Sequence, residues 1–195
     1  MPRPQLILAS SSPYRRELLA RLRLPFAVVS PGTDEAAHPG EAPAALALRL
    51  ARAKADAVAA RFPAAIVIGA DQVAVLDGAT LAKPGTHANA AAQLRAVRGR
   101  RVSFLTAVAV VQRSTGRAAE RLVPCEVEFR DYPERSIEAY LRAEQPYDCA
   151  GAAKIEGLGI ALTQRIVGED PTALIGLPLI ALVELLGDLG YDVLE

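Results

Sequence analysis

Side chains that could bind phosphate gather near the N-terminus, in the segment Ser10-Ser11-Ser12-Pro13-Tyr14-Arg15-Arg16. A short apolar run precedes this segment, and Ser12 followed by Pro13 is typical of a helix cap and first helical residue. Backbone N–H groups at a helix start, hydroxyls and guanidinium groups together would form a cradle for an anion. An ordinary capped helix with solvated arginines explains the same pattern, so the segment is a candidate phosphate site.

An aspartate interrupts the apolar segment Ile68-Gly69-Ala70-Asp71-Gln72-Val73. A carboxylate among apolar residues is unfavourable unless it has a partner or a chemical task. Asp71 could deprotonate a water molecule or hold a divalent cation beside phosphates, and Gly69 would allow a ligand to approach the backbone closely. A turn aspartate is the alternative, but the apolar pattern resumes at Val73, which favours a functional role for Asp71.

Lysine is rare in this chain. Of the 22 Lys and Arg residues, only Lys54, Lys83 and Lys154 are lysines. A compact ammonium group suits phosphate oxygens, which makes Lys54 and Lys83 candidate phosphate ligands. Chance explains so small a number equally well.

The glycine-rich segment Gly151–Gly159 contains one carboxylate, Glu156. Such a loop could bring Glu156 against the edge of a ligand. A plain surface loop accounts for the same pattern.

The elements that must position these residues follow from apolar periodicity and turn signals. The Asp77-Gly78 pair predicts a β-hairpin, and Thr86 predicts a helix cap. Mixed strands and helices in a 195-residue chain predict one domain, 1–195, of the α/β class with a mixed β-sheet flanked by helices. The expected strands are 5–9, 26–29, 65–69 continuing through 73–76, 102–112, 118–129 and 160–167, and the expected helices are 15–22, 43–62, 86–97, 133–143 and 177–189.

Composition excludes several classes of partner. The 22 basic and 22 acidic residues balance to zero net charge, which argues against a nucleic-acid partner. Cys125 and Cys149 lack the spacing of a zinc site.

The N-terminal residues lack a secretory signal, and the C-terminal apolar stretch is interrupted by Pro178, Glu184 and Asp188, so we expect no membrane partner and a cytoplasmic location. The sequence is compatible with a homodimer and does not fix the oligomeric state.

Taken together, six segments resemble the Maf family of nucleoside triphosphate pyrophosphatases: LASSSPYRR, ARAKA, IGADQV, AKP, CAGAAKIEGLG and GLPL. They occur in the family's order and spacing, and the resemblance covers essentially the whole chain. The resemblance implies a Maf/ITPase-like fold and the hydrolysis of a nucleoside triphosphate to its monophosphate and pyrophosphate.

The resemblance also implies roles for individual residues. Asp71 would be the proton acceptor that activates water. Glu35 would lie near the phosphates and, with Asp71, near a divalent cation such as Mg²⁺ or Mn²⁺, although a solvated loop carboxylate explains Glu35 too. The triphosphate would be bound by Ser10, Ser12, Arg15, Lys54 and Lys83.

Three positions depart from the dTTP/UTP-hydrolysing members, which have Arg, Thr and Gln where this chain has Tyr14, Gln72 and Glu156. An aromatic residue, Gln and Glu resemble the branch that hydrolyses 7-methyl-GTP, in which Trp is more usual than Tyr at the first position. A carboxylate can accept two hydrogen bonds from the guanine edge, and the cationic methylated base favours an aromatic face.

We therefore expect an enzyme that converts 7-methyl-GTP to 7-methyl-GMP and pyrophosphate, which would remove modified nucleotides. One alternative is a dTTP/UTP pyrophosphatase of the same family. The other is a non-catalytic nucleotide-binding regulator of cell division, which would have no need of an uncompensated carboxylate at Asp71.

Overall fold

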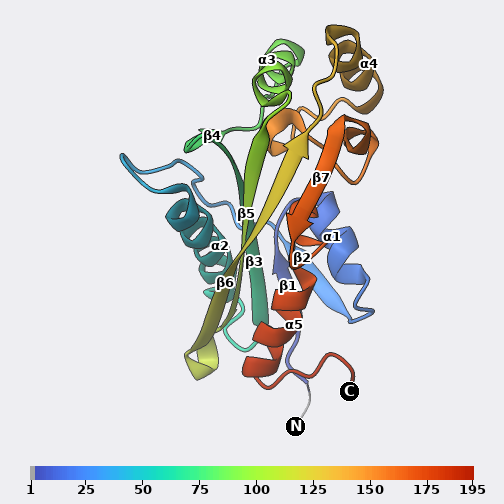
Figure 1. Ribbon diagram of the computed structural model, residues 1–195. Helices are drawn as coiled ribbons and strands as arrows, with labels where there is room; N and C mark the ends of the chain where they lie inside the picture. The colour runs from blue at the N-terminus through green and yellow to red at the C-terminus, as the bar shows by residue number, and fades with distance from the viewer. Residues whose placement is uncertain (1–2) are drawn as a thin grey trace. The chain divides into compact units, whose positions relative to one another are not determined.

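The computed structural model describes residues 3–195. Its strands form one seven-stranded sheet, flanked by five α-helices (Figure 1). The strands are β1 (Leu6–Ala9), β2 (Phe26–Val29), β3 (Ile66–Leu76), β4 (Ala79–Leu81), β5 (Arg101–Gln112), β6 (Arg117–Phe129) and β7 (Thr163–Gly168). The helices are α1 (Pro13–Ala20), α2 (Pro43–Ala59), α3 (His87–Val97), α4 (Glu134–Glu144) and α5 (Leu179–Asp188).

The strand order is β2-β1-β3-β5-β6-β7, and β4 pairs with β3. Strand β1 runs parallel to both β2 and β3, whereas β4 is antiparallel to β3 and β7 is antiparallel to β6. The sheet is therefore mixed, which confirms the predicted α/β class.

Contacts along the chain define two compact units. Unit 1 comprises the residues up to Asp71, Thr106–Val123 and Asp170–Glu195, and unit 2 comprises Gln72–Leu105 and Pro124–Glu169. Strands β3, β5 and β6 each contribute residues to both units.

In unit 1, helices cover both faces of the parallel strands. Alternate residues of β1 and β3, such as Leu6 and Ile66, pack with α1 and α5 in one apolar core. Helix α2 covers the opposite face, where its small buried residues Ala51 and Ala55 lie against Gly69 of β3. This close contact fixes the position of α2 on the sheet.

In unit 2, two predicted local signals form as expected. Asp77 and Gly78 both have positive φ (49° and 82°), which suits a tight hairpin between β3 and β4. The Thr86 hydroxyl accepts a hydrogen bond from the Asn89 amide and so caps α3. Helix α3 packs against α4 and against the turn at Ala150–Ala152.

The expected elements all form, with shifted ends. The strand expected at 160–167 begins only at Thr163, because Leu158–Leu162 form a short 3₁₀ segment. The amide of Leu158 donates to the carboxylate of Glu144 in α4 at 2.8 Å, and the Thr163 hydroxyl donates to the Gly159 carbonyl, so this stretch is bonded both to α4 and within itself. The helix expected at 43–62 ends at Ala59.

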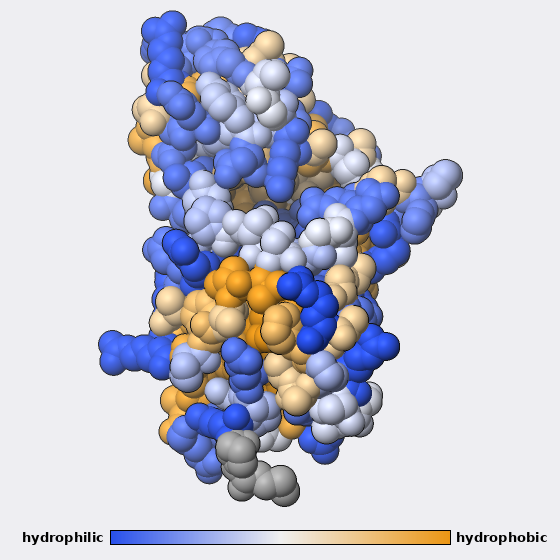
Figure 2. Space-filling model, turned by 180° about the vertical axis from the view of Figure 1, so that it is seen from behind, coloured by the Kyte–Doolittle hydropathy of each residue, from blue (hydrophilic) through white to orange (hydrophobic). Residues whose placement is uncertain are grey.

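On the face in Figure 2, apolar side chains gather in one patch bordered by hydrophilic ones. Among the described residues, no helix is both long enough and apolar enough to cross a membrane. Cys125 and Cys149 are both free thiols.

Candidate active site

In unit 1, two carboxylates meet at the ammonium group of Lys54. Its Nζ lies 2.6 Å from Oδ1 of Asp71 and 2.6 Å from Oε1 of Glu35. Lys54 and Asp71 are buried, whereas the Glu35 side chain is 53% exposed. The structure thus brings together three residues that the sequence analysis singled out separately. It also corrects the description of Asp71 as uncompensated, because Lys54 is its counter-ion.

The pairing of Lys54 with Asp71 follows from the periods of a helix and a strand. On α2, Lys54 shares a face with Ala51 and Ala55, three residues before it and one after it. On β3, Asp71 points to the same side as Gly69, two residues earlier. Because Ala51 and Ala55 pack on Gly69, the next residues on these two faces, Lys54 and Asp71, come into contact.

Gly69 is needed for this contact. A Cβ atom at this position would lie 2.2 Å from the Ala51 carbonyl oxygen and 2.7 Å from the Ala55 nitrogen. The expectation that a ligand approaches the backbone at Gly69 is therefore wrong, since helix α2 occupies that space.

The serine-rich turn caps α1. The Ser12 hydroxyl accepts from the Arg15 amide at 3.4 Å, and the buried Ser10 hydroxyl accepts from the Ser12 amide at 3.1 Å. The predicted cap at Ser12 with Pro13 as first helical residue is confirmed. Tyr14, partly buried, lies in this first turn. The turn thus presents hydroxyls and a helix N-terminus together, an arrangement that suits an anion.

Arg15 lies in the field of the two carboxylates. Its Nε donates to the carbonyl of Gly176 at 2.9 Å. Burial lowers the pKa of the guanidinium, while the negative charges of Asp71 and Glu35 oppose that shift. Gly176 has φ of +115°, a conformation that favours glycine. In the sequence, Gly176 belongs to the family motif GLPL, and no local pattern indicates its contact with Arg15.

The other three predicted residues belong to unit 2. Gln72 follows Asp71 on β3 and is partly buried. Lys83 is exposed, and the carbonyls on either side of it are fixed by α3: Gln93 donates to Ala82 at 2.8 Å, and Asn89 donates to Pro84 at 3.0 Å. Lys83 therefore projects from a segment with a defined backbone.

Glu156 lies in a turn on the surface of unit 2. Desolvation raises the pKa of its carboxyl, and the negative charges of Glu144 and Asp148 add to that shift. A hydrogen bond to the backbone of Glu156 itself and the positive charge of Lys154 oppose it. Lys154 itself forms an ion pair of 2.6 Å with Glu144. This ion pair therefore connects the loop to the C-terminal end of α4.

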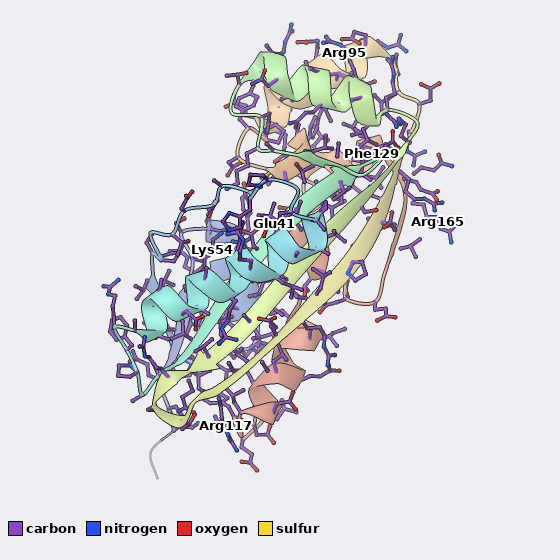
Figure 3. The ribbon with its side chains drawn as sticks, turned by 90° about the vertical axis from the view of Figure 1, so that its left-hand side faces the viewer. Glu41, Lys54, Arg95, Arg117, Phe129 and Arg165 are labelled. Atoms are coloured by element: carbon purple, nitrogen blue, oxygen red, sulfur yellow. The ribbon has the colours of Figure 1, made fainter. Side chains whose placement is uncertain are left out.

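Two residues near Lys54 escaped the sequence analysis. Arg49 on α2 binds Glu41 through Nε and Nη2, at 2.6 and 2.7 Å. The Arg49 guanidinium lowers the pKa of Glu41 to about 2, helped by the backbone amide of His38. Figure 3 labels Lys54 on α2 and Glu41 in the loop that precedes this helix. An acid and a base eight residues apart follow no regular spacing, so no sequence signal pointed to this pair.

The donor set suits a hard cation. Asp71 and Glu35 already place two carboxylates around one positive charge, and oxygen ligands are what Mg²⁺ prefers. Among residues 3–195, no group of three or more His, Cys, Asp or Glu side chains is placed to hold a metal ion. Substrate phosphates and water would have to complete the coordination of such an ion, as is usual for Mg²⁺.

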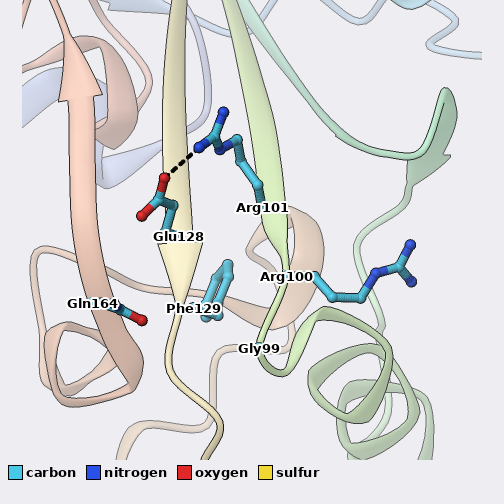
Figure 4. Close-up of a pocket in the computed structure, with 6 residues that line it drawn as sticks. All are labelled: Gly99, Arg100, Arg101, Glu128, Phe129 and Gln164. Atoms are coloured by element: carbon cyan, nitrogen blue, oxygen red, sulfur yellow. Dashed lines mark hydrogen bonds and ion pairs between the residues drawn. The ribbon is translucent and has the colours of Figure 1, made fainter.

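A surface pocket in unit 2 contains none of the predicted residues. It is lined by Gly99, Arg100, Arg101, Glu128, Phe129 and Gln164 (Figure 4). Arg101 forms an ion pair with Glu128 inside it, so two of its charged groups already neutralise each other. The chemistry of this pocket does not resemble that around Asp71.

Comparison with known proteins extends the resemblance. A family model described as Maf-like protein matches residues 5–189. A protein of Albidiferax ferrireducens named 7-methyl-GTP pyrophosphatase is 59% identical over 97% of this chain and 96% of its own length. One of the same name from Methylobacillus flagellatus is 58% identical over 98% of this chain and all of its own. Among solved structures, a HAM1 protein from Coxiella burnetii aligns with a TM-score of 0.46 and 16% identity, over 67% of this chain and 75% of that one.

Proposed function

The chain belongs to the Maf family, and we propose that it is a pyrophosphatase that hydrolyses 7-methyl-GTP to 7-methyl-GMP and pyrophosphate. The observation that carries this proposal is the cluster of Lys54, Asp71 and Glu35. It combines a carboxylate that can accept a proton with a cation that can bind phosphate. The relatives that carry this substrate in their names match the chain over nearly its full length.

In the proposed reaction, Asp71 takes a proton from a water molecule. The water oxygen then forms a bond to the α-phosphorus, and the bond between that phosphorus and the α–β bridging oxygen breaks. The electron pair of the broken bond leaves with pyrophosphate. Lys54, held 2.6 Å from Asp71, is close enough to contact the phosphates that surround the attacked centre.

We propose that the cationic and hydroxyl groups named in the sequence analysis bind the triphosphate. Arg15 supplies a guanidinium already influenced by Asp71 and Glu35, and Ser10 and Ser12 lie at the start of α1. Lys83 extends from its fixed segment. Each of these groups would bind charge without reading the base.

We propose Asp71 and Glu35 as ligands of a divalent cation, Mg²⁺ or Mn²⁺. When bound, such an ion would neutralise negative charge on the pyrophosphate leaving group. The two carboxylates that share Lys54 support this assignment.

We propose that Tyr14, Gln72 and Glu156 determine which nucleotide base the enzyme accepts. The carboxylate of Glu156 can pair with the guanine edge, and the ring of Tyr14 suits the positive charge of the methylated base. Gln72, next to Asp71, would orient the base. The dTTP/UTP preference remains the alternative within the family.

We further propose that residues 1–195 work as one domain in the cytoplasm, where both cysteines would remain reduced. The proposal includes no nucleic-acid or membrane partner. A homodimer is the assembly that we would test first. A non-catalytic nucleotide-binding regulator is less well supported, because a protein that only binds a nucleotide has no need of a carboxylate such as Asp71 beside the proposed phosphate ligand Lys54.

Product analysis tests the proposal. Purified protein with Mg²⁺ is incubated with 7-methyl-GTP, GTP, UTP and dTTP in ¹⁸O-water. We expect 7-methyl-GTP to be cleaved fastest, with pyrophosphate released and the ¹⁸O label in the monophosphate. Orthophosphate and a nucleoside diphosphate as first products would overturn the pyrophosphatase assignment. Faster cleavage of UTP or dTTP would overturn only the choice of base.

A further inference from the structure

The loop before α2 is attached to that helix by Arg49. The Arg49 guanidinium donates to both carboxylate oxygens of Glu41, and its Nη2 also donates to the Ala36 carbonyl at 2.9 Å. One side chain therefore binds the loop at two positions. Its planar fork of donors makes this pattern feasible, whereas the compact ammonium group of lysine does not match it.

The loop is also bonded internally. The amide of His38 donates to the Glu41 carboxylate at 3.0 Å, and the amide of Ala36 donates to Asp34 at 2.9 Å. The Glu41 side chain is only 10% exposed. Because Glu41 accepts from Arg49 and from the loop backbone, it connects the loop fold to α2.

These contacts restrain the backbone next to Glu35. Ala36, which Arg49 binds, is its direct neighbour in the chain, and Lys54, which Glu35 binds, follows Arg49 by five residues on α2. Arg49 and Lys54 therefore hold adjacent positions of the loop from one helix. The Glu35 side chain is half exposed at its contact with Lys54. Without Arg49, the backbone next to Glu35 would lose the hydrogen bond that holds the Ala36 carbonyl.

We propose that Arg49 is a positioning residue, which acts through Glu41 and the Ala36 carbonyl to hold Glu35 against Lys54, the ion-pair partner of Asp71. The effect on catalysis rests on the function proposed above, whereas the effect on the loop does not. Arg49 itself contacts no reacting group in this account. Its role is to keep the second carboxylate of the cluster in place.

A neighbouring arginine provides the matched control. Arg52, three residues later on α2, pairs with Asp56 at 2.9 Å, and both side chains are 41–50% exposed. Exposed pairs of this kind contribute little to stability. The ion-pair partners of Arg52, Asp56 and Glu120, both lie outside the 34–41 loop, so Arg52→Ala removes an arginine from the same helix without releasing the loop.

The kinetic test is a double-mutant cycle with wild type, Arg49→Ala, Glu35→Gln and the double variant. We expect each single change to lower kcat/KM by about tenfold, and the double variant to lie within about twofold of Glu35→Gln, because both changes remove the same restraint. Arg52→Ala should stay within about twofold of wild type. Losses that multiply in the double variant would overturn the proposal, as would full activity of Arg49→Ala or of Glu35→Gln.

A second readout is independent of catalysis. Amide hydrogen exchange of a peptide covering 34–42 should be faster in Arg49→Ala than in wild type by about tenfold or more, and unchanged in Arg52→Ala. Unchanged exchange in Arg49→Ala would overturn the positioning role even if activity fell. The two experiments can also disagree. If exchange is faster in Arg49→Ala but the wild-type protein releases no pyrophosphate, the loop restraint is supported and the proposed function is contradicted.

Discussion

Gly69 of β3 lies so close to Ala51 of α2 that a Cβ on the glycine would be 2.2 Å from the alanine carbonyl oxygen. This contact allows Lys54 to reach Asp71, because the two charged residues lie one step further along the same helix face and the same strand face. The contact between Lys54 and Asp71 therefore depends on the absence of a Cβ atom at position 69.

Gly69→Ala should separate α2 from β3. Because the clash is with backbone rather than with a flexible side chain, we expect a loss of about 1–3 kcal/mol in the free energy of unfolding and a clear loss of kcat. Chemical denaturation and steady-state kinetics measure the two effects. Gly187→Ala in α5 is the control, since nothing lies within 4 Å of a Cβ there. Equal stability of the two variants would contradict the packing argument.

The Glu41–Arg49 pair predicts a specific dependence on pH. The pKa of Glu41 is lowered to about 2 in the folded protein, so its contribution to stability is complete above the pKa of an unfolded glutamate and is lost as pH falls toward 2. Glu41→Gln should therefore lower the unfolding midpoint at pH 7, and the gap to wild type should narrow between pH 4.5 and pH 3. Thermal unfolding at these pH values tests this, and a gap that stays constant would be inconsistent with the pair.

Lys54 and Lys83 are expected to act on phosphate and not on the base. Each Ala variant should lose kcat/KM for 7-methyl-GTP, GTP and UTP by similar factors, because phosphates carry no base identity. Lys54→Ala also leaves Asp71 buried without its cation, so its unfolding midpoint should fall, whereas exposed Lys83 should tolerate the change. An altered ranking of the three nucleotides with unchanged efficiency would assign these lysines another role.

Tyr14 and Glu156 are expected to determine base preference. Glu156→Ala should lower kcat/KM for 7-methyl-GTP by about tenfold to a hundredfold, because a buried polar edge left unpaired costs about 1–3 kcal/mol. Tyr14→Ala should reduce the advantage of 7-methyl-GTP over GTP, since the cation–aromatic interaction exists only for the charged base, and Tyr14→Trp should keep it. The measurement is the ratio of kcat/KM values for 7-methyl-GTP, GTP and UTP in wild type and in each variant. Equal effects of both Ala variants on all nucleotides would exclude a role in base selection.

Local patterns in the sequence predicted the fold well and the site in part. Asp71 was recognised because a carboxylate interrupts an apolar strand, and Ser12 because a cap is defined by its immediate neighbours. The glycine at position 69 was recognised as a point of close approach, but its partner was misidentified, since only the tertiary structure shows that α2 fills the space.

Contacts between distant residues could not be predicted in this way. Arg15 bonds to Gly176 across 161 residues of sequence, and Arg49 bonds to Glu41 across a loop with no regular period. Both pairs depend on how helices and loops pack, which periodicity does not specify. The strand expected to begin at 160 is shorter because the 3₁₀ segment Leu158–Leu162 replaces its start, and the first amide of that segment is bonded to Glu144 of α4.

The central claim is that Asp71 activates the water that attacks the nucleotide, and Asp71→Asn tests it most directly. Asparagine has nearly the same shape, its side-chain oxygen can still accept from Lys54, and Glu35 remains as a counter-ion for the lysine, so the variant should unfold at a temperature close to that of wild type. The measurement is kcat for pyrophosphate release from 7-methyl-GTP by the folded variant. We predict a kcat lower than wild type by about a hundredfold or more, as expected for loss of a general base. A folded Asp71→Asn protein that turns over at nearly the wild-type rate would contradict the account.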